Sequence, residues 1–169
     1  MTLTRERLTE LLSYNPETGE FRWLIRPKKS KNPVGSVAGT IKDRNAENKY
    51  LLIWVDGLLH RAHRLAWLCT YGSWPAKNID HINGDGTDNR LSNLRECNQQ
   101  QNNGNHRRLN RTNTSGFRGV TWKSDRKKWK AFININNRQT HVGYFDTKEA
   151  AYEAYRIAAI KHFGEFARV

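Results

Sequence analysis

The chain has 169 residues, of which 37% are hydrophobic, and it carries a formal net charge of +13. This length suffices for one large domain or two small ones. Its apolar runs are shorter than the ~20 residues that a membrane-spanning helix needs, so we expect no membrane partner. The N-terminus lacks a charged start followed by an apolar run, and therefore no signal peptide is expected. Cys69 and Cys97 are too few for a cysteine-rich zinc site, and a reducing, cytoplasmic setting is the expectation.

The positive charge is concentrated toward the C-terminus, where residues 106–169 hold 14 basic and 5 acidic side chains. The chain also contains six Trp, six Tyr and six Phe, which bury much area per residue. A basic, aromatic-rich segment indicates nucleic acid as the partner. The alternative is a soluble basic protein with no such partner.

The first part of the chain shows short elements separated by Gly and Pro. Asp56 and Gly57 between two apolar runs form a strong hairpin signal. Gly72 and Pro75 end the second helix. The expected elements are a helix over 4–13, a turn over 15–19, strands over 20–25, 37–42 and 49–55, and a helix over 63–71. His60 and His63, near the second helix, are expected to be structural.

A strand–loop–strand–helix unit follows. Short strands are expected over 79–81 and 94–97, and the loop between them is rich in Gly, Asn and Asp. A polar helix is expected over 98–105. Residues 105–115 form a basic linker that could contact phosphates or act as a solvated tether.

The last segment predicts three strands and a helix. The strands are expected over 117–123, 128–136 and 140–145, and the middle strand alternates apolar and polar side chains. Asp146 stands at the N-cap position of a helix over 147–163, with Glu149 three residues on. Gly164 is the expected residue just past its C-terminus.

The 80–102 region concentrates the side chains that can perform chemistry. A carboxylate and several amide oxygens suit a hard divalent cation, and a neutral imidazole can take a proton from water. The alternative is ordinary turn chemistry: Asp80 could cap the loop, Asn93 could be structural, and Asn83, Asp85, Asp88 and Asn89 could be turn formers. Arg90 and Arg95 could clamp phosphate, although surface arginines usually do not.

These residues also resemble the HNH nuclease family. The resemblance covers most of residues 50–106 and rests on residues 63–67 (HRLAW), 79–85 (IDHINGD), 88–90 (DNR), 93–95 (NLR) and 101–102 (QN). It implies a ββα-metal active site in which Asp80 is the first metal ligand and His81 the general base. Asn93 would orient the histidine and pin the hairpin, and Asn102 would be the second ligand. His106, on the same helical face, is the alternative second ligand.

The C-terminal segment resembles the APETALA2-like DNA-binding domain over residues 114–168. The resemblance rests on residues 115–120 (SGFRGV), 129–131 (WKA), 142–145 (VGYF) and 149–155 (EAAYEAY). That family lays its sheet in the major groove. The aligned DNA-facing positions are Arg118, Thr121, Lys123, Lys130, Phe132, Asn134, Gln139, His141 and Tyr144. Thr121, Phe132, Asn134 and His141 depart from the plant pattern, so the target sequence does not transfer. Linker residues Arg107, Arg108 and Arg111 are further candidate DNA contacts.

The expected fold is α+β, with a ββα-metal HNH module and N-terminal strands over 1–104 (core about 78–106), a linker over 105–115 and an APETALA2-like domain over 116–169. The expected activity is hydrolysis of double-stranded DNA, nicking or cutting, with Mg²⁺ and with Mn²⁺ as a substitute. A homing-type phage or bacterial enzyme, monomeric or dimeric on DNA and without a small-molecule cofactor, fits this reading. A non-catalytic DNA-binding regulator is the main rival, and a zinc-stabilised structural protein is the second.

Overall fold

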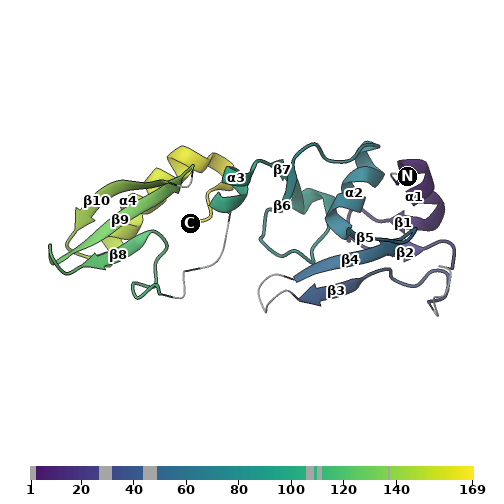
Figure 1. Ribbon diagram of the computed structural model, residues 1–169, viewed down its shortest axis with the longest axis horizontal. Helices are drawn as coiled ribbons and strands as arrows, with labels where there is room; N and C mark the ends of the chain where they lie inside the picture. The colour runs from purple at the N-terminus through teal and green to yellow at the C-terminus, as the bar shows by residue number, and fades with distance from the viewer. Residues whose placement is uncertain (1–2, 27–31, 44–48, 106–108, 110–111, 137) are drawn as a thin grey trace. The chain divides into compact units, whose positions relative to one another are not determined.

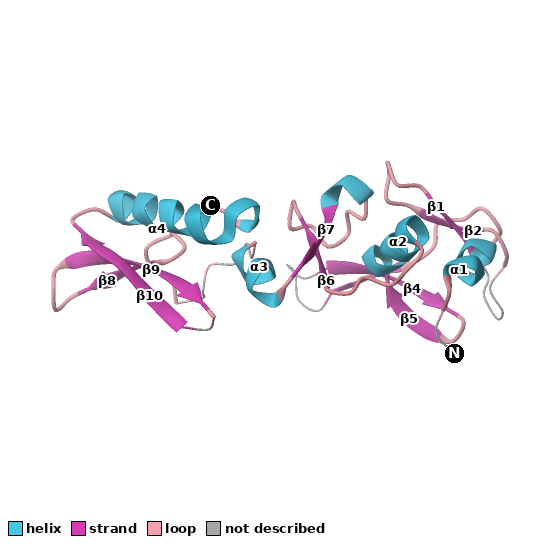
Figure 2. Ribbon diagram, turned by 90° about the horizontal axis from the view of Figure 1, so that it is seen from above, coloured by secondary structure: helices cyan, strands magenta, loops and turns pink. Residues whose placement is uncertain are grey.

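The computed structural model describes residues 3–26, 32–43, 49–105, 109, 112–136 and 138–169. The chain forms two compact units, which divide between Cys97 and Asn98. Figure 1 follows the chain through these units in sequence order, and Figure 2 distinguishes helices from strands. Within the described residues, no helix is both long and apolar enough to cross a membrane.

The first unit begins with a short helix and a hairpin. Helix α1 (Arg5–Leu11) is capped by the Thr4 hydroxyl, which accepts from the Arg7 amide. Strands β1 (Leu12–Tyr14) and β2 (Phe21–Trp23) then pair antiparallel. The predicted helix over 4–13 therefore begins one residue too early and ends two residues too late, and strand β1 is an element that the sequence pattern does not predict. Leu12 is already extended because its backbone pairs with Trp23.

A three-stranded antiparallel sheet follows, in the order β3 (Thr40–Asp43), β4 (Lys49–Val55) and β5 (Leu58–Arg61). The predicted Asp56-Gly57 hairpin is confirmed, since both residues adopt the positive φ angles that a tight two-residue turn requires. Helix α2 (Ala62–Tyr71) ends at Gly72, whose left-handed conformation closes the helix.

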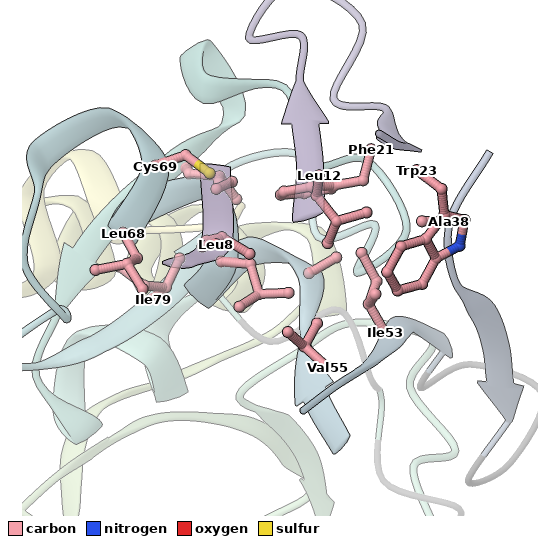
Figure 3. Close-up of a cluster of buried hydrophobic side chains, with 14 residues drawn as sticks. Leu8, Leu12, Phe21, Trp23, Ala38, Ile53, Val55, Leu68, Cys69 and Ile79 are labelled. Atoms are coloured by element: carbon pink, nitrogen blue, oxygen red, sulfur yellow. The ribbon is translucent and has the colours of Figure 1, made fainter. Parts of the chain in front are cut away.

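The core of this unit lies where α1, α2 and the two sheets meet. Leu8, Leu12, Phe21 and Ile53 are fully buried, and Leu65 and Leu68 from α2 join them. Figure 3 shows these apolar side chains converging from elements that are far apart in the sequence. The core also receives Ile79 and Leu94, so it anchors the next hairpin, β6 (Asn78–His81) and β7 (Leu94–Cys97).

The second unit contains α3 (Gln99–Gly104), a three-stranded sheet and a long helix. The strands are β8 (Val120–Lys123), β9 (Lys128–Ile135) and β10 (Arg138–Phe145), all antiparallel, with β9 central. Helix α4 (Lys148–Phe163) packs across all three strands and is followed by a short 3₁₀ turn, η2 (Gly164–Phe166). Ala151, Tyr155, Ala159 and Phe163 form its buried side.

The cap of α4 differs from the predicted one. Thr147 is the N-cap residue, and its hydroxyl accepts from the Ala150 amide at 3.2 Å. Asp146 instead pairs with Lys128 at 3.1 Å, where β9 begins. The prediction chose the carboxylate one residue too early, because either side chain can cap a helix and only the backbone path selects between them.

Candidate functional site

The β6–β7 hairpin holds the two residues at the centre of the candidate site. Asp80 and His81 are consecutive on β6, and their Cα partners on β7 are Arg95 and Leu94. Each is only 5% exposed. Successive strand residues point to opposite sides, so the carboxylate and the imidazole leave the backbone in different directions. A buried charge and a buried imidazole side by side need specific partners, and the surroundings supply them.

Asp80 is neutralised from across the hairpin. Both the Nε and Nη2 atoms of Arg95 donate to its Oδ2 oxygen, each at 3.1 Å. Both side chains are largely buried, which makes this ion pair costly to break by removing one partner. Arg95, which the sequence analysis considered as a phosphate clamp, is therefore engaged in this ion pair. Arg90, the other such candidate, pairs with Asp88 at 2.6 Å.

The loop between β6 and β7 is closed by the Asn93 side chain. Its Oδ1 accepts from the Asn83 amide at 2.9 Å, and its Nδ2 donates to the Asp88 carbonyl at 2.8 Å and to Asn83 Oδ1 at 3.1 Å. The Asn93 carbonyl accepts from the Ile82 amide. Asn93 is 6% exposed. One carboxamide therefore ties the start and the middle of the loop to its end at Asn93, beside His81. Whether Asn93 also orients the histidine stays a prediction.

Two segments from earlier in the chain support this loop. The Leu91 amide donates to the Pro16 carbonyl, and the Tyr14 hydroxyl donates to the Asn89 carbonyl at 2.7 Å. A Cβ at Gly19 would lie 2.5 Å from the Arg90 nitrogen, so only glycine allows this turn to approach. Gly86 lies equally close to the start of β4, since a Cβ there would overlap the Lys49 carbonyl oxygen.

A second histidine lies against His81. The rings of His63, on α2, and His81 are 4.9 Å apart and nearly perpendicular, and Tyr50 on β4 lies near both rings. His63 is 3% exposed. The sequence assigned His63 a structural role and did not place it beside His81. The one hint of a role at the site was that His63 belongs to the family-like segment 63–67. Sequence spacing alone does not reveal a contact between α2 and β6.

Burial favours the neutral form of both imidazoles. Burial lowers the pKa of His63 to about 3, and its electrostatic interactions with His81, Arg61 and Arg64 act in the same direction. Burial also lowers the pKa of His81, against the Asn89 side chain and the carboxylates of Asp80, Asp85 and Asp88, which raise it. A neutral imidazole is the form that can accept a proton.

The remaining predicted ligands are placed in part. Asn102 lies on α3, within the second compact unit, and His106 lies outside the described residues. Among the residues that the structure describes, no cluster of three or more His, Cys, Asp or Glu could hold a metal ion. That finding does not bear on a set of one aspartate and one asparagine. Asn102 as the second ligand therefore stays a prediction.

The predicted DNA-facing strand residues share one face of the second sheet. The register pairs Thr121 with Lys130, Lys130 with Tyr144, and Phe132 with His141. A bulge between His141 and Gly143 adds one residue to β10, which returns Tyr144 to the face of His141. This sheet face, defined here as the polar face, comprises Thr121, Lys123, Lys128, Lys130, Phe132, Asn134, Gln139, His141 and Tyr144.

The other candidate DNA contacts lie elsewhere. Arg118 precedes β8, and its Nη1 donates to the Gly104 carbonyl at 2.9 Å. Arg107, Arg108 and Arg111 lie outside the described residues. Trp122, left open between stacking and packing, lies edge-on to Trp129 yet remains 43% exposed.

Replacing Asn93 by Ala should destabilise the first unit by about 1–3 kcal/mol, because the Asn83 amide and the Asp88 carbonyl lose their buried partner. Urea unfolding of the two proteins measures the difference. Ser92→Ala, at the neighbouring exposed position, is the matched control and should change stability little. Equal stability of Asn93→Ala and the wild type would contradict the clamp.

Stability should also fall as the pH is lowered from about 6.5 toward 3. In this window the unfolded chain protonates His63 while the folded chain keeps it neutral, so acid favours unfolding; above pH 6.5 the effect is absent. His63→Gln removes this titration and should flatten the decline. Unfolding free energies of both proteins between pH 4 and 7 measure it, and parallel curves would refute the assignment.

Comparison with known proteins finds one family and one relative. The HNH endonuclease family matches residues 60–104, which include α2, β6, β7 and α3. The chain is 31% identical to protein 3.8 of Escherichia phage T7 over 109 residues, covering 64% of this chain and 88% of the phage protein. No solved structure matches it. The match to residues 60–104 contains Asp80, His81 and Asn93, and the phage protein is aligned over most of its length. The chain therefore carries an HNH endonuclease family domain at residues 60–104 and is a homologue of a phage protein.

Proposed function

We propose that this protein is a metal-dependent endonuclease that hydrolyses phosphodiester bonds in double-stranded DNA. The observation that carries the proposal is the buried Asp80-His81 pair on β6, inside the segment that matches the HNH endonuclease family. An HNH domain implies DNA as the substrate, and the net charge of +13 suits a polyanion.

His81 is the proposed general base. A neutral imidazole can take the proton of a water molecule that attacks the phosphorus in line. Its ring is held by contacts with His63 and Tyr50, and the loop that follows it is fixed by the Asn93 carboxamide. These contacts restrict the orientation of the base before DNA arrives, which is the condition for efficient proton transfer.

The donor set fits a hard divalent cation. Asp80 offers a buried carboxylate, and Asn102, with His106 as the alternative, would supply the second protein ligand. Oxygen ligands of this kind suit Mg²⁺, with Mn²⁺ as a substitute. Both cysteines are buried, and burial raises the pKa of Cys97 to about 11. When bound, the cation would polarise the scissile phosphate and stabilise the departing 3′-oxygen.

The second unit is the proposed DNA reader, similar to an APETALA2-like domain. Its polar face carries Lys123, Lys128 and Lys130 beside aromatic and amide side chains, and a twisted three-stranded sheet fits the major groove. Lys130 lies over the Phe132 ring and donates to Gln139 Oε1 at 2.7 Å, so its ammonium is already oriented on this face. The nuclease unit would cut, and the reader would place the cut.

His81→Ala should reduce DNA cleavage by about 10²–10⁴-fold, because the base is lost, while DNA affinity stays near that of the wild type. Nicking of supercoiled plasmid with Mg²⁺, and with EDTA as the blank, measures the rate. His162→Ala, which changes an exposed histidine on α4, is the control and should cleave normally. Undiminished cleavage by His81→Ala would refute the assigned base. A wild type that binds DNA but never cuts it would favour the non-catalytic regulator.

Lys130→Ala should weaken DNA binding and lower the slope of log affinity against log salt by about 1, as expected for one lost phosphate contact. Fluorescence anisotropy with a labelled duplex at several salt concentrations measures both quantities. Lys161→Ala, on the exposed side of α4, is the control with the same change in charge. Equal effects of the two variants would mean that the polar face is not the DNA-binding surface.

A further inference from the structure

Helix α3 is too short to hold its position by itself. It spans Gln99–Gly104, and its first turn is closed by a reciprocal capping box between Asn98 and Gln101. Isolated helices of this length are not stable in water, so the location of α3 depends on what it packs against. The chain reaches α3 from β7 through Asn98 alone.

The contacts of α3 are with the end of the chain. It packs against α4 and η2, and it belongs to the compact unit that begins at Asn98. Gly104 lies so close to Phe163 and Phe166 that an added Cβ would come within 3.0 Å of the Phe163 ring and 3.1 Å of the Phe166 carbonyl. A side chain at the last residue of the helix would therefore require Phe163 or Phe166 to shift by a few tenths of an ångström.

The Gly104 carbonyl is the second point of attachment. It accepts from Arg118 Nη1 at 2.9 Å and from the Arg168 amide at 3.4 Å. Carbonyls at the end of a helix lack intrahelical partners, and these donors satisfy one of them. Arg118 precedes β8 and Arg168 follows η2, so two separate segments of the second unit meet at one atom.

The opposite end of α3 is packed less closely. Gln99 and Gln100 line a cavity of about 650 Å³ together with Arg118, Phe132, Tyr155 and Phe163. The first turn of α3 therefore borders open space, although Gln100 does contact His162. The attachment of the helix depends mainly on its last residue.

We infer that Arg118 and Gly104 fix α3 to the second unit, and that the DNA reader thereby sets the position of the helix that carries Asn102. Arg118 is then a positioning residue for the metal ligand rather than a base-reading contact. This inference deepens the proposed function and rests on it only for the role of Asn102.

The first test needs neither DNA nor metal. Hydrogen exchange of the full chain is followed in Arg118→Met and in Arg156→Met, a control on α4 whose guanidinium pairs with Glu153. We expect amides of residues 98–105 to exchange about three- to tenfold faster in Arg118→Met, as one lost hydrogen bond allows, with β8–β10 unchanged. Arg118→Lys, which keeps a donor, should recover part of the protection.

The outcomes separate clearly. Unchanged exchange over residues 98–105 in Arg118→Met overturns the inference. Exchange that rises equally in α3 and in β8–β10 also overturns it, because Arg118 would then support the whole unit. Gly104→Ala provides a second route, since its Cβ would crowd Phe163 at 3.0 Å, and it too should loosen α3 selectively.

The second test connects α3 to cleavage. At saturating DNA, Arg118→Met should need about three- to tenfold more Mg²⁺ for half-maximal nicking, if it loses the same single hydrogen bond, whereas Arg156→Met should not. A normal Mg²⁺ requirement with faster exchange in α3 would overturn the link to the metal ligand. If the wild type does not cut DNA, the proposed function fails, and the exchange data still decide whether Arg118 holds α3.

Discussion

The Asn93 carboxamide is the constraint on which the candidate site depends. It bonds to backbone and side-chain groups at the start and in the middle of the β6–β7 loop, and it is itself buried. The loop is polar and rich in glycine, so it contributes little apolar burial of its own. The carboxamide therefore acts together with the contacts from Tyr14 and Pro16 to hold one loop conformation. The geometry of the candidate site is maintained by hydrogen bonds, while the apolar core fixes the hairpin that carries them.

The environment of His81 is built by parts of the chain that precede the loop. Tyr50 comes from β4 and His63 from α2, and both rings contact the His81 ring. The turn at Gly19 and the β4 backbone at Lys49 lie in close contact with the loop. The N-terminal segment is therefore a structural part of the candidate active site. The HNH match covers only residues 60–104, and the N-terminal segment supplies much of the apolar core against which that region packs.

The chain changes units at α3. The HNH match includes this helix, yet its packing partners are α4 and η2 in the second unit. The expected domain division fell after residue 104, at the basic linker, whereas the compact units divide after Cys97. Composition favours the linker as a boundary because it is polar. Contacts place the boundary earlier because Gly104 approaches Phe163 and Phe166 too closely to be separate from them.

Several local elements could be predicted from residue patterns alone. The Asp56-Gly57 hairpin, the Gly72 stop and the alternating faces of β9 follow from turn chemistry and side-chain period, which act over a few residues. The sequence also marked Asp80, His81 and Asn93 as one group, because they lie close together in a family-like motif. Only the tertiary structure decided that His63 lies against His81, that Arg95 neutralises Asp80 and that Arg118 holds Gly104. Those contacts join residues distant in sequence, and they depend on how the elements pack, which no local pattern records.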